Sequence, residues 1–242
     1  MTGKLVNTEW RLLRREPLVL FWGVAFPVIL LVVMGLASSG PDKELGGASL
    51  VATYVPIVIA MTLAVLALTA LPTAVGTYRE NGVLRRLATT PVGPERVLVA
   101  QLAVNAAVTA TASILVLLVA RVAFGVGLPG QALGFVVAYV LTAAALLGIG
   151  MLLAAVAPSA RSASAIGAIA FFPMMFFAGL WVPRATMGET LRDVSDGTPL
   201  GAAVGALQAA MHGDFPRPLY LAVLAAWAIV AAAAARTLFR WD

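Results

Sequence analysis

The chain has 242 residues, of which 61% are hydrophobic and 11% are charged, and it contains no cysteine. This composition excludes an ordinary soluble domain, in which about 25% of residues are charged, and the missing cysteines exclude disulfides and thiol chemistry. A net charge of +5 would suggest nucleic acid as the partner of a soluble protein. Here the basic residues gather at the ends of apolar segments, where topology and anionic lipid headgroups account for them. We expect a membrane protein without a nucleic-acid partner.

Six uncharged apolar runs are long enough to cross a membrane, because a helix needs about 20 residues to span the hydrocarbon core. They predict spanning helices over residues 18–38, 50–71, 97–120, 131–157, 162–182 and 218–235. The runs use most of the chain and leave no segment large enough to bury a separate core. The predicted fold class is an all-α polytopic membrane protein with a single transmembrane domain over residues 1–242.

Lys and Arg are distributed unevenly between the two sides that these spans define. The side of both termini carries eleven: Lys4, Arg11, Arg14, Arg15, Arg79, Arg85, Arg86, Arg96, Arg161, Arg236 and Arg240. The other side carries five: Lys43, Arg121, Arg184, Arg192 and Arg217. Basic residues favour the cytoplasmic side, so we expect both termini to be cytoplasmic, in a bacterial cytoplasmic (inner) membrane.

Residues 4–16 predict an amphipathic helix ahead of the first span, because polar and apolar side chains alternate there with helical spacing. We expect this elbow helix to lie in the cytoplasmic interface, in contact with membrane lipid. The interface residues are Trp10, Arg11, Arg14 and Arg15. The pair Glu16-Pro17 then ends the helix, because the residue before proline disfavours helix and proline suits the first turn of the next one.

A compact charged segment, residues 78–94, separates the second and third spans and must leave the bilayer. Three apolar residues lie on one side of a short helix and an arginine pair lies off that side, so we expect a cytoplasmic coupling helix over residues 79–93. The residues assigned to coupling are Arg79, Glu80, Gly82, Leu84, Arg85, Arg86, Leu87 and Pro91. The alternative is a basic loop that only sets topology.

The connection over residues 183–217 is the longest and is only half polar. Residues 186–194 and 199–211 each predict a short amphipathic helix, with a turn at 195–198 between them. We expect a re-entrant helical pair over residues 184–212 in the outer leaflet, where helical backbone keeps its polar groups satisfied.

Polar and aromatic residues inside the spans are candidates for a substrate path. Threonines recur along the second span, polar amides are four residues apart on the third, and Phe and Met cluster around a proline in the fifth. The candidate path residues are Thr69, Thr73, Gln101, Asn105, Phe172, Met175 and Phe176. The alternatives are interhelical hydrogen bonding and close packing for the polar residues, and lipid-facing or packing roles for the Phe and Met cluster.

Several functions are disfavoured by what the spans lack. None contains Asp, Glu, Lys, Arg or His, whereas ion-coupled transporters need an ionisable or ion-coordinating group in the membrane. The chain has no Gly-x4-Gly-Lys-Ser/Thr loop to hold ATP phosphates, and no span offers the side chains of an intramembrane enzyme. The lone histidine, His212, gives no metal site. We expect a non-catalytic subunit that binds no cofactor or metal and is powered by another chain.

Three local patterns make the chain similar to the permease subunits of type 2 ATP-binding cassette exporters, especially the daunorubicin-resistance-like branch. The patterns are Arg15-Glu16-Pro17 with Phe26-Pro27, Arg79-Glu80-Asn81-Gly82-Val83-Leu84 with Leu87 and Thr90-Pro91, and Pro183 followed by Pro199-Leu200. The resemblance implies six helices with an elbow helix, a coupling helix and an extracellular re-entrant pair.

The resemblance also implies partners and a function. It predicts a cognate ATPase subunit in two copies, which would bind ATP and Mg, a second permease copy or paralogue, and a hydrophobic small-molecule substrate. In the coupling segment, Glu80 would make a charged contact with the ATPase and Leu84 would be the buried anchor. The expected function is efflux of hydrophobic or amphipathic compounds, such as drugs. Lipid or glycoconjugate export by the same architecture and an ion-coupled drug transporter are the alternatives.

Overall fold

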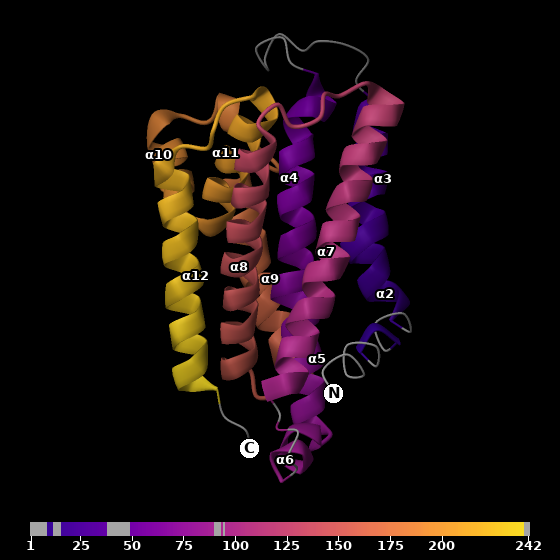
Figure 1. Cartoon of the computed structure of the whole chain (residues 1–242), viewed down its shortest axis with the longest axis vertical. Helices are drawn as coiled ribbons and strands as arrows, with labels where there is room; N and C mark the ends of the chain where they lie inside the picture. The colour runs from indigo at the N-terminus through magenta and orange to yellow at the C-terminus, as the bar shows by residue number, and fades with distance from the viewer. Residues whose placement is uncertain (1–8, 12–15, 38–48, 90–92, 94, 240–242) are drawn as a thin grey trace.

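The computed structural model describes residues 9–11, 16–37, 49–89, 93 and 95–239 (Figure 1). These residues are predominantly helical and contain no β-strand. Six helices are long and apolar enough to cross a membrane, which confirms the predicted number. The all-α polytopic fold class is therefore correct.

The first spanning helix is built from α2 (Pro17–Leu20), a π-helical turn η1 (Phe21–Ala25) and α3 (Phe26–Ala37), and the second from α4 (Leu50–Val65), a π-helical turn η2 (Leu66–Ala70) and α5 (Leu71–Glu80). The others are α7 (Glu95–Phe124), α8 (Ala132–Val156), α9 (Ala160–Ala178) and α12 (Pro218–Leu238). The second helix continues to Glu80, well beyond the expected residue 71. It ends at the bend at Gly82 and not where the apolar run ends. The fifth ends before the expected 182 at Gly179, whose φ of 91° is a helix-ending conformation that glycine adopts readily.

The connections gather at the two ends of the bundle. A short helix, α6 (Val83–Ala88), lies at one end, and η3 (Arg184–Thr186), α10 (Glu189–Gly197) and α11 (Pro199–His212) lie at the other (Figure 1). The segment expected as one helix over 79–93 is therefore divided: Arg79 and Glu80 complete α5, and α6 is much shorter. Of the expected elbow helix, residues 9–11 are helical. Pro91, Arg14 and Arg15 lie outside the described residues.

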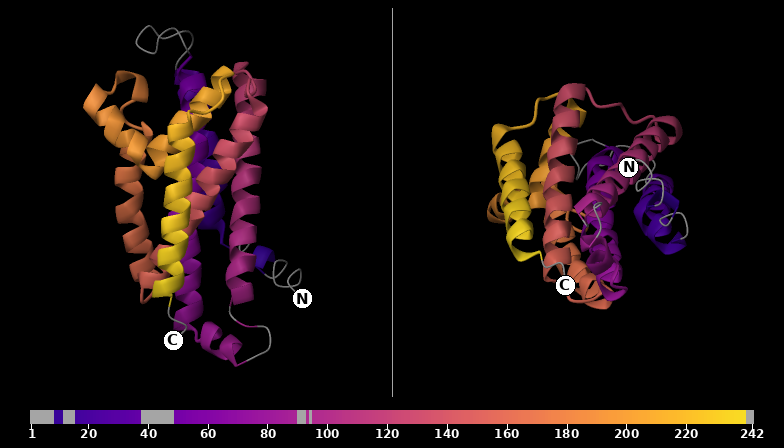
Figure 2. Two further views of the ribbon diagram at one scale, coloured as in Figure 1. Left: turned by 60° about the vertical axis from the view of Figure 1, so that its left-hand side comes forward. Right: turned by 60° about the horizontal axis from the view of Figure 1, so that its bottom comes forward.

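The second spanning helix is the centre of the molecule. In its most apolar window 78% of residues are buried, against at most 39% in the other five spanning helices. It packs against α3, α7, α8, α9 and α11. The α12 helix packs mainly on α8, on the side away from α3 (Figure 2). The core therefore surrounds one helix, and the outer helices expose their apolar sides.

The α11 helix differs from the amphipathic helix expected over 199–211. All residues from Pro199 to Leu207 are buried, between α4, α8, α9 and α12. The expectation was wrong because the helix is rich in glycine and alanine, whose small side chains let neighbours approach on every side. By contrast α10 is amphipathic, with one buried residue, Ser195.

Candidate functional site

A groove of about 630 Å³ lies between the first, second and fifth spanning helices. Trp22 and Phe26 line one wall, Phe171 and Phe172 of α9 line the other, and Thr69 lies on the central helix between them. Further lining residues extend from Glu16, ahead of α2, to Leu180 and Trp181, beyond α9. The groove therefore extends along most of the length of the bundle.

The backbone is irregular in both of the first two helices where they line the groove. The amide of Phe26 donates to the carbonyl of Phe21, and the amide of Leu71 donates to that of Leu66, five residues earlier in each case. A proline follows each turn, Pro27 and Pro72, and cannot bond the carbonyl four residues before it. Such π-helical turns are often found at functional sites, and Trp22 and Thr69 lie within them.

The groove is less polar than its threonines suggest. The hydroxyl of Thr69 donates to the Val65 carbonyl at 2.5 Å, and that of Thr73 donates to the Thr69 carbonyl at 2.7 Å. Each hydroxyl hydrogen is therefore used within its own helix, so a ligand would find acceptor oxygens. Glu16 is the one charged side chain among the lining residues that the structure describes.

Aromatic rings form the most distinctive part of the lining. The rings of Trp22 and Phe26 are 4.8 Å apart, and Phe172 stacks with Trp181 at 6.5 Å. Half or more of the surface of Phe172 and Trp181 remains exposed, at 59% and 53%. These rings are available to an apolar or aromatic ligand.

Only part of the predicted path set lies in the groove. Thr69, Thr73 and Phe172 line it, whereas the remaining four residues do not. Met175 is fully buried in the core, and Phe176 does not contribute to the lining. Helical spacing could not separate these residues from the lining ones, because Met175 and Phe176 lie one turn beyond Phe171 and Phe172 on the same side of α9.

Gln101 and Asn105 of α7 belong to a chain of polar contacts instead. The Asn105 amide donates to the Gln101 carbonyl at 2.9 Å, and the Gln101 amide lies 3.5 Å from the Tyr78 hydroxyl. That hydroxyl donates to the carboxylate of Glu9 at 2.5 Å. Burial raises the pKa of the Glu9 carboxyl, an effect that the bond from Tyr78 partly offsets. The contacts join residues 9–11, α5 and α7, which agrees with the packing alternative for this pair.

The elbow residues that the structure describes have different surroundings. Trp10 packs against a small cluster of Leu66, Val104 and Val108, while Arg11 is exposed. Trp10 therefore packs against the helix bundle, in addition to its predicted place in the membrane interface.

At the α6 end, Arg79 and Glu80 bind the turn between α8 and α9. The Arg79 guanidinium donates to the Ala154 carbonyl at 3.1 Å and to the Ala157 carbonyl. The Glu80 carboxylate accepts from the Ala160 amide at 3.1 Å. These two residues, expected to face a partner, thus have partners within the chain.

The rest of α6 is divided between core and surface. Gly82, with φ of 65°, makes the bend from α5, a left-handed conformation that glycine adopts without strain. Leu84 is 1% exposed and packs in the protein's own core, so it offers no surface as an anchor for another chain. Leu87 is partly buried, whereas Arg85 and Arg86 are exposed. Among the coupling residues that the structure describes, the arginine pair and Glu80 are exposed, and of these Glu80 is hydrogen-bonded to Ala160 of the same chain.

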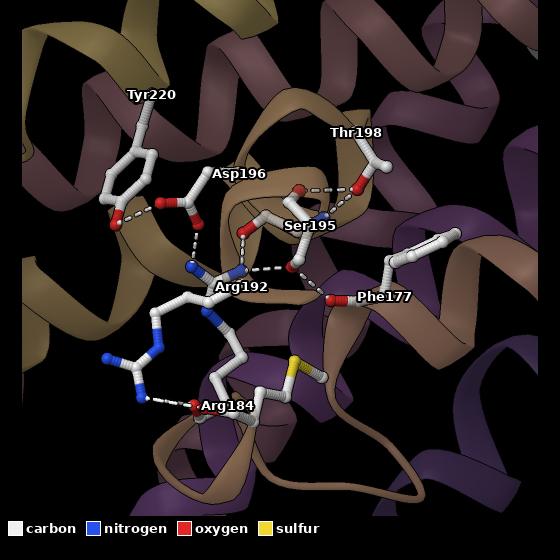
Figure 3. Close-up of polar contacts among 9 residues, drawn as sticks. Phe177, Arg184, Arg192, Ser195, Asp196, Thr198 and Tyr220 are labelled. Atoms are coloured by element: carbon white, nitrogen blue, oxygen red, sulfur yellow. Dashed lines mark hydrogen bonds and ion pairs between the residues drawn. The ribbon is translucent and has the colours of Figure 1, made fainter. Parts of the chain in front are cut away.

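A buried polar network holds the opposite end together (Figure 3). The Arg184 guanidinium, in a residue only 7% exposed, pairs with the Asp196 carboxylate and donates to the Ser195 hydroxyl at 2.6 Å and the Gly201 carbonyl at 2.8 Å. Asp196 also accepts from the Tyr220 hydroxyl at 3.4 Å. The network joins η3, α10, α11 and α12 in one unit.

Sequence reasoning missed Glu9, Tyr78 and the Arg184–Asp196 pair as interacting residues. Their partners are 69 and 12 positions away, beyond the reach of helical periodicity. One signal was available for Arg79: Pro158 follows α8 and has no amide hydrogen, so the Ala154 carbonyl needs a donor from elsewhere.

Comparison with known proteins identifies the family of the chain. No curated protein matches the chain. The sequence profile described as ABC-2 type transporter matches residues 2–212, which covers five of the six spanning helices and the groove. The chain therefore belongs to the ABC-2 type transporter family, whose members are membrane components of transporters that work with an ATPase.

Proposed function

We propose that the chain is the permease subunit of an ATP-driven exporter that moves hydrophobic and amphipathic compounds, including drugs, outward across the bacterial cytoplasmic membrane. The observation that carries the proposal is the position of α5. Thr73 on this helix lines the groove, and its last residue, Glu80, leads through one bend into α6. A force applied at α6 therefore reaches the groove along a single helix.

In this proposal the α6 end is cytoplasmic, and the exposed Arg85 and Arg86 meet an acidic groove on the cognate ATPase, since charge complementarity guides docking. The excess of basic residues on that side supports the orientation. Two ATPase copies bind the ATP and Mg, while this chain binds none. A second permease copy or paralogue completes the path.

The lining of the groove supports an amphipathic substrate. Aromatic walls suit an apolar body, and the Glu16 carboxylate at one extreme of the lining favours a cationic polar end over an anionic one. An exporter of lipids could use the same architecture. A zwitterionic headgroup has no net charge, so its binding would not require the Glu16 carboxylate.

The test is transport by the complex that co-purifies from native membranes, reconstituted in proteoliposomes. ATP should drive movement of rhodamine 6G, an amphipathic cation, and Phe172→Ala should slow it by up to about tenfold, since an aromatic contact contributes about 0.5–1.5 kcal/mol. Ile229→Ala, at an exposed site on α12 away from the groove, is the control and should leave transport unchanged.

Three other outcomes contradict the proposal. Movement of fluorescent phosphatidylcholine without rhodamine would identify a lipid exporter, and transport that follows a proton gradient and ignores ATP would identify a secondary transporter. Equal rates in wild type, Phe172→Ala and Ile229→Ala would remove the groove from the path.

A further inference from the structure

We propose that Arg79 and Glu80 act as an internal joint: they fasten the corner between α5 and α6 to the turn between α8 and α9, and so carry movement of α6 into the bundle. They are positioning residues, and the ATPase contact is left to the exposed arginines of α6. This inference rests on the proposed function, because it takes α6 as the element on which the ATPase acts.

The Arg79 side of the joint follows from a missing donor. Within a continuing helix the Ala154 carbonyl would accept from the amide four residues on, but that position is Pro158. The Arg79 guanidinium supplies the donor at 3.1 Å and also binds the Ala157 carbonyl, just past the last residue of α8. A cation at the carboxyl end of a helix also meets the negative end of its dipole.

The Glu80 side satisfies the amino end of α9 in the same way. Ser159 caps this helix and its hydroxyl accepts from the Ser162 amide, which leaves the first helical amide, that of Ala160, for another acceptor. The Glu80 carboxylate fills this place at 3.1 Å. An anion at the amino end of a helix meets the positive end of its dipole.

The order of the two charges matches the order of the two helix ends. Adjacent residues of opposite charge meet adjacent helix ends of opposite polarity, so exchanging the charges would make both contacts repulsive. The fit is close, because a Cβ atom on Gly76 would lie 2.8 Å from the backbone nitrogen of Ala160. The Arg79 guanidinium also lies 5.4 Å from the centre of the Phe239 ring, beyond α12.

The joint links α6 to two parts of the groove lining. Thr73 of α5 and Ser164 of α9 both line the groove, and the Glu80–Ala160 bond ties the ends of these helices together. A displacement of α6 is therefore transmitted to both helices at once. Without the joint, a movement of α6 and α5 would reach α9 only through the packing between α5 and α9.

The experiment compares variants of the full permease–ATPase complex in proteoliposomes, with recovery of the ATPase, ATP hydrolysis and ATP-driven rhodamine 6G export measured on the same samples. Glu80→Ala should leave ATPase recovery unchanged and lower export per ATP hydrolysed by about tenfold or more. Glu80→Gln keeps an acceptor oxygen for the Ala160 amide and should retain most of the export. Arg85→Glu should instead lower ATPase recovery.

Each contrary result has a definite meaning. Loss of ATPase recovery in Glu80→Ala would place Glu80 at the partner and overturn the joint, as would unchanged export per ATP. Equal loss in Glu80→Gln and Glu80→Ala would overturn the bond to Ala160 as the working contact. If Glu80→Ala does not fold, the comparison of Glu80→Gln with wild type decides, and a loss of export in Glu80→Gln overturns the joint. A wild-type complex without ATPase or export would refute the proposed function instead.

Discussion

Replacing Arg184 with methionine should strongly destabilise the end of the bundle that carries α10 and α11. The substitution keeps an unbranched apolar side chain and removes the charged guanidinium, which leaves the Asp196 carboxylate, 14% exposed, without its cation. Ser195 keeps its bond to the Phe177 carbonyl and Asp196 keeps the Tyr220 hydroxyl, while the Gly201 carbonyl loses one donor. The main effect is therefore a buried carboxylate without its cation. Removing one partner of a buried ion pair costs about 3–5 kcal/mol.

This cost can be measured as a change in melting temperature. In proteins of this size about 1 kcal/mol corresponds to about 2–4 °C, so Tm should decrease by about 6–20 °C. Intrinsic tryptophan fluorescence during heating in detergent is a suitable signal, because the Trp227 indole donates to the Gly197 carbonyl at the end of α10 at 3.2 Å. Arg217→Met, at an exposed position, is the matched control and should leave Tm unchanged.

The double variant Arg184→Met/Asp196→Leu tests the reasoning more strictly. Removing both charges eliminates the uncompensated carboxylate, so much of the lost stability should return. The reasoning is refuted if Arg184→Met and Arg217→Met lower Tm equally, or if the double variant is less stable than Arg184→Met.

Three further predictions concern other parts of the molecule. Because burial raises the pKa of Glu9, the folded state binds the proton more tightly, and the free energy of unfolding should fall as pH rises from the ordinary carboxyl pKa to the raised one. Glu9→Gln, which keeps an acceptor for Tyr78, should remove this slope in Tm measured against pH. Gly76→Ala should cost about 1–3 kcal/mol through overpacking, seen as a lower Tm, and an unchanged Tm would contradict the close contact. In intact cells an impermeant maleimide should label a cysteine at Asp214 and not one at Asn81, both exposed, and the reverse would reject the topology.

The number and type of spanning helices could be predicted because lipid imposes a simple rule on long apolar segments. Helix ends were less predictable, since they depend on local geometry such as the bend at Gly82. The contacts of Arg79 and Glu80 could not be derived, because their partners are backbone groups 75 to 80 positions away. Pro158 indicates that the Ala154 carbonyl needs a donor but not which residue supplies it. A charge pattern alone does not distinguish a side chain that faces another chain from one that binds a helix end within its own.

The candidate groove was predicted only in part for a similar reason. Thr69 and Thr73 were found from their spacing, and Phe172 from its aromatic cluster. Trp22 and Trp181 were not, because the first and fifth helices come together only in the folded bundle. Gln101 and Asn105 follow a helical stripe as regular as that of the threonines, but α7 turns this stripe toward Tyr78 and not toward the groove.

The two helices that flank α6 are longer than the other spanning helices. The continuous helix from Leu50 to Glu80 has 31 residues and α7 has 30, whereas the other four spanning helices have 19 to 25. At 1.5 Å per residue the two longer helices measure about 45 Å, and a typical tilt of about 20° shortens this only slightly. They exceed the ~30 Å hydrocarbon core by more than two helical turns. At the α6 end the second helix extends past the neighbouring helices (Figure 1) and carries α6 beyond the end of the bundle, where a water-soluble protein can approach it.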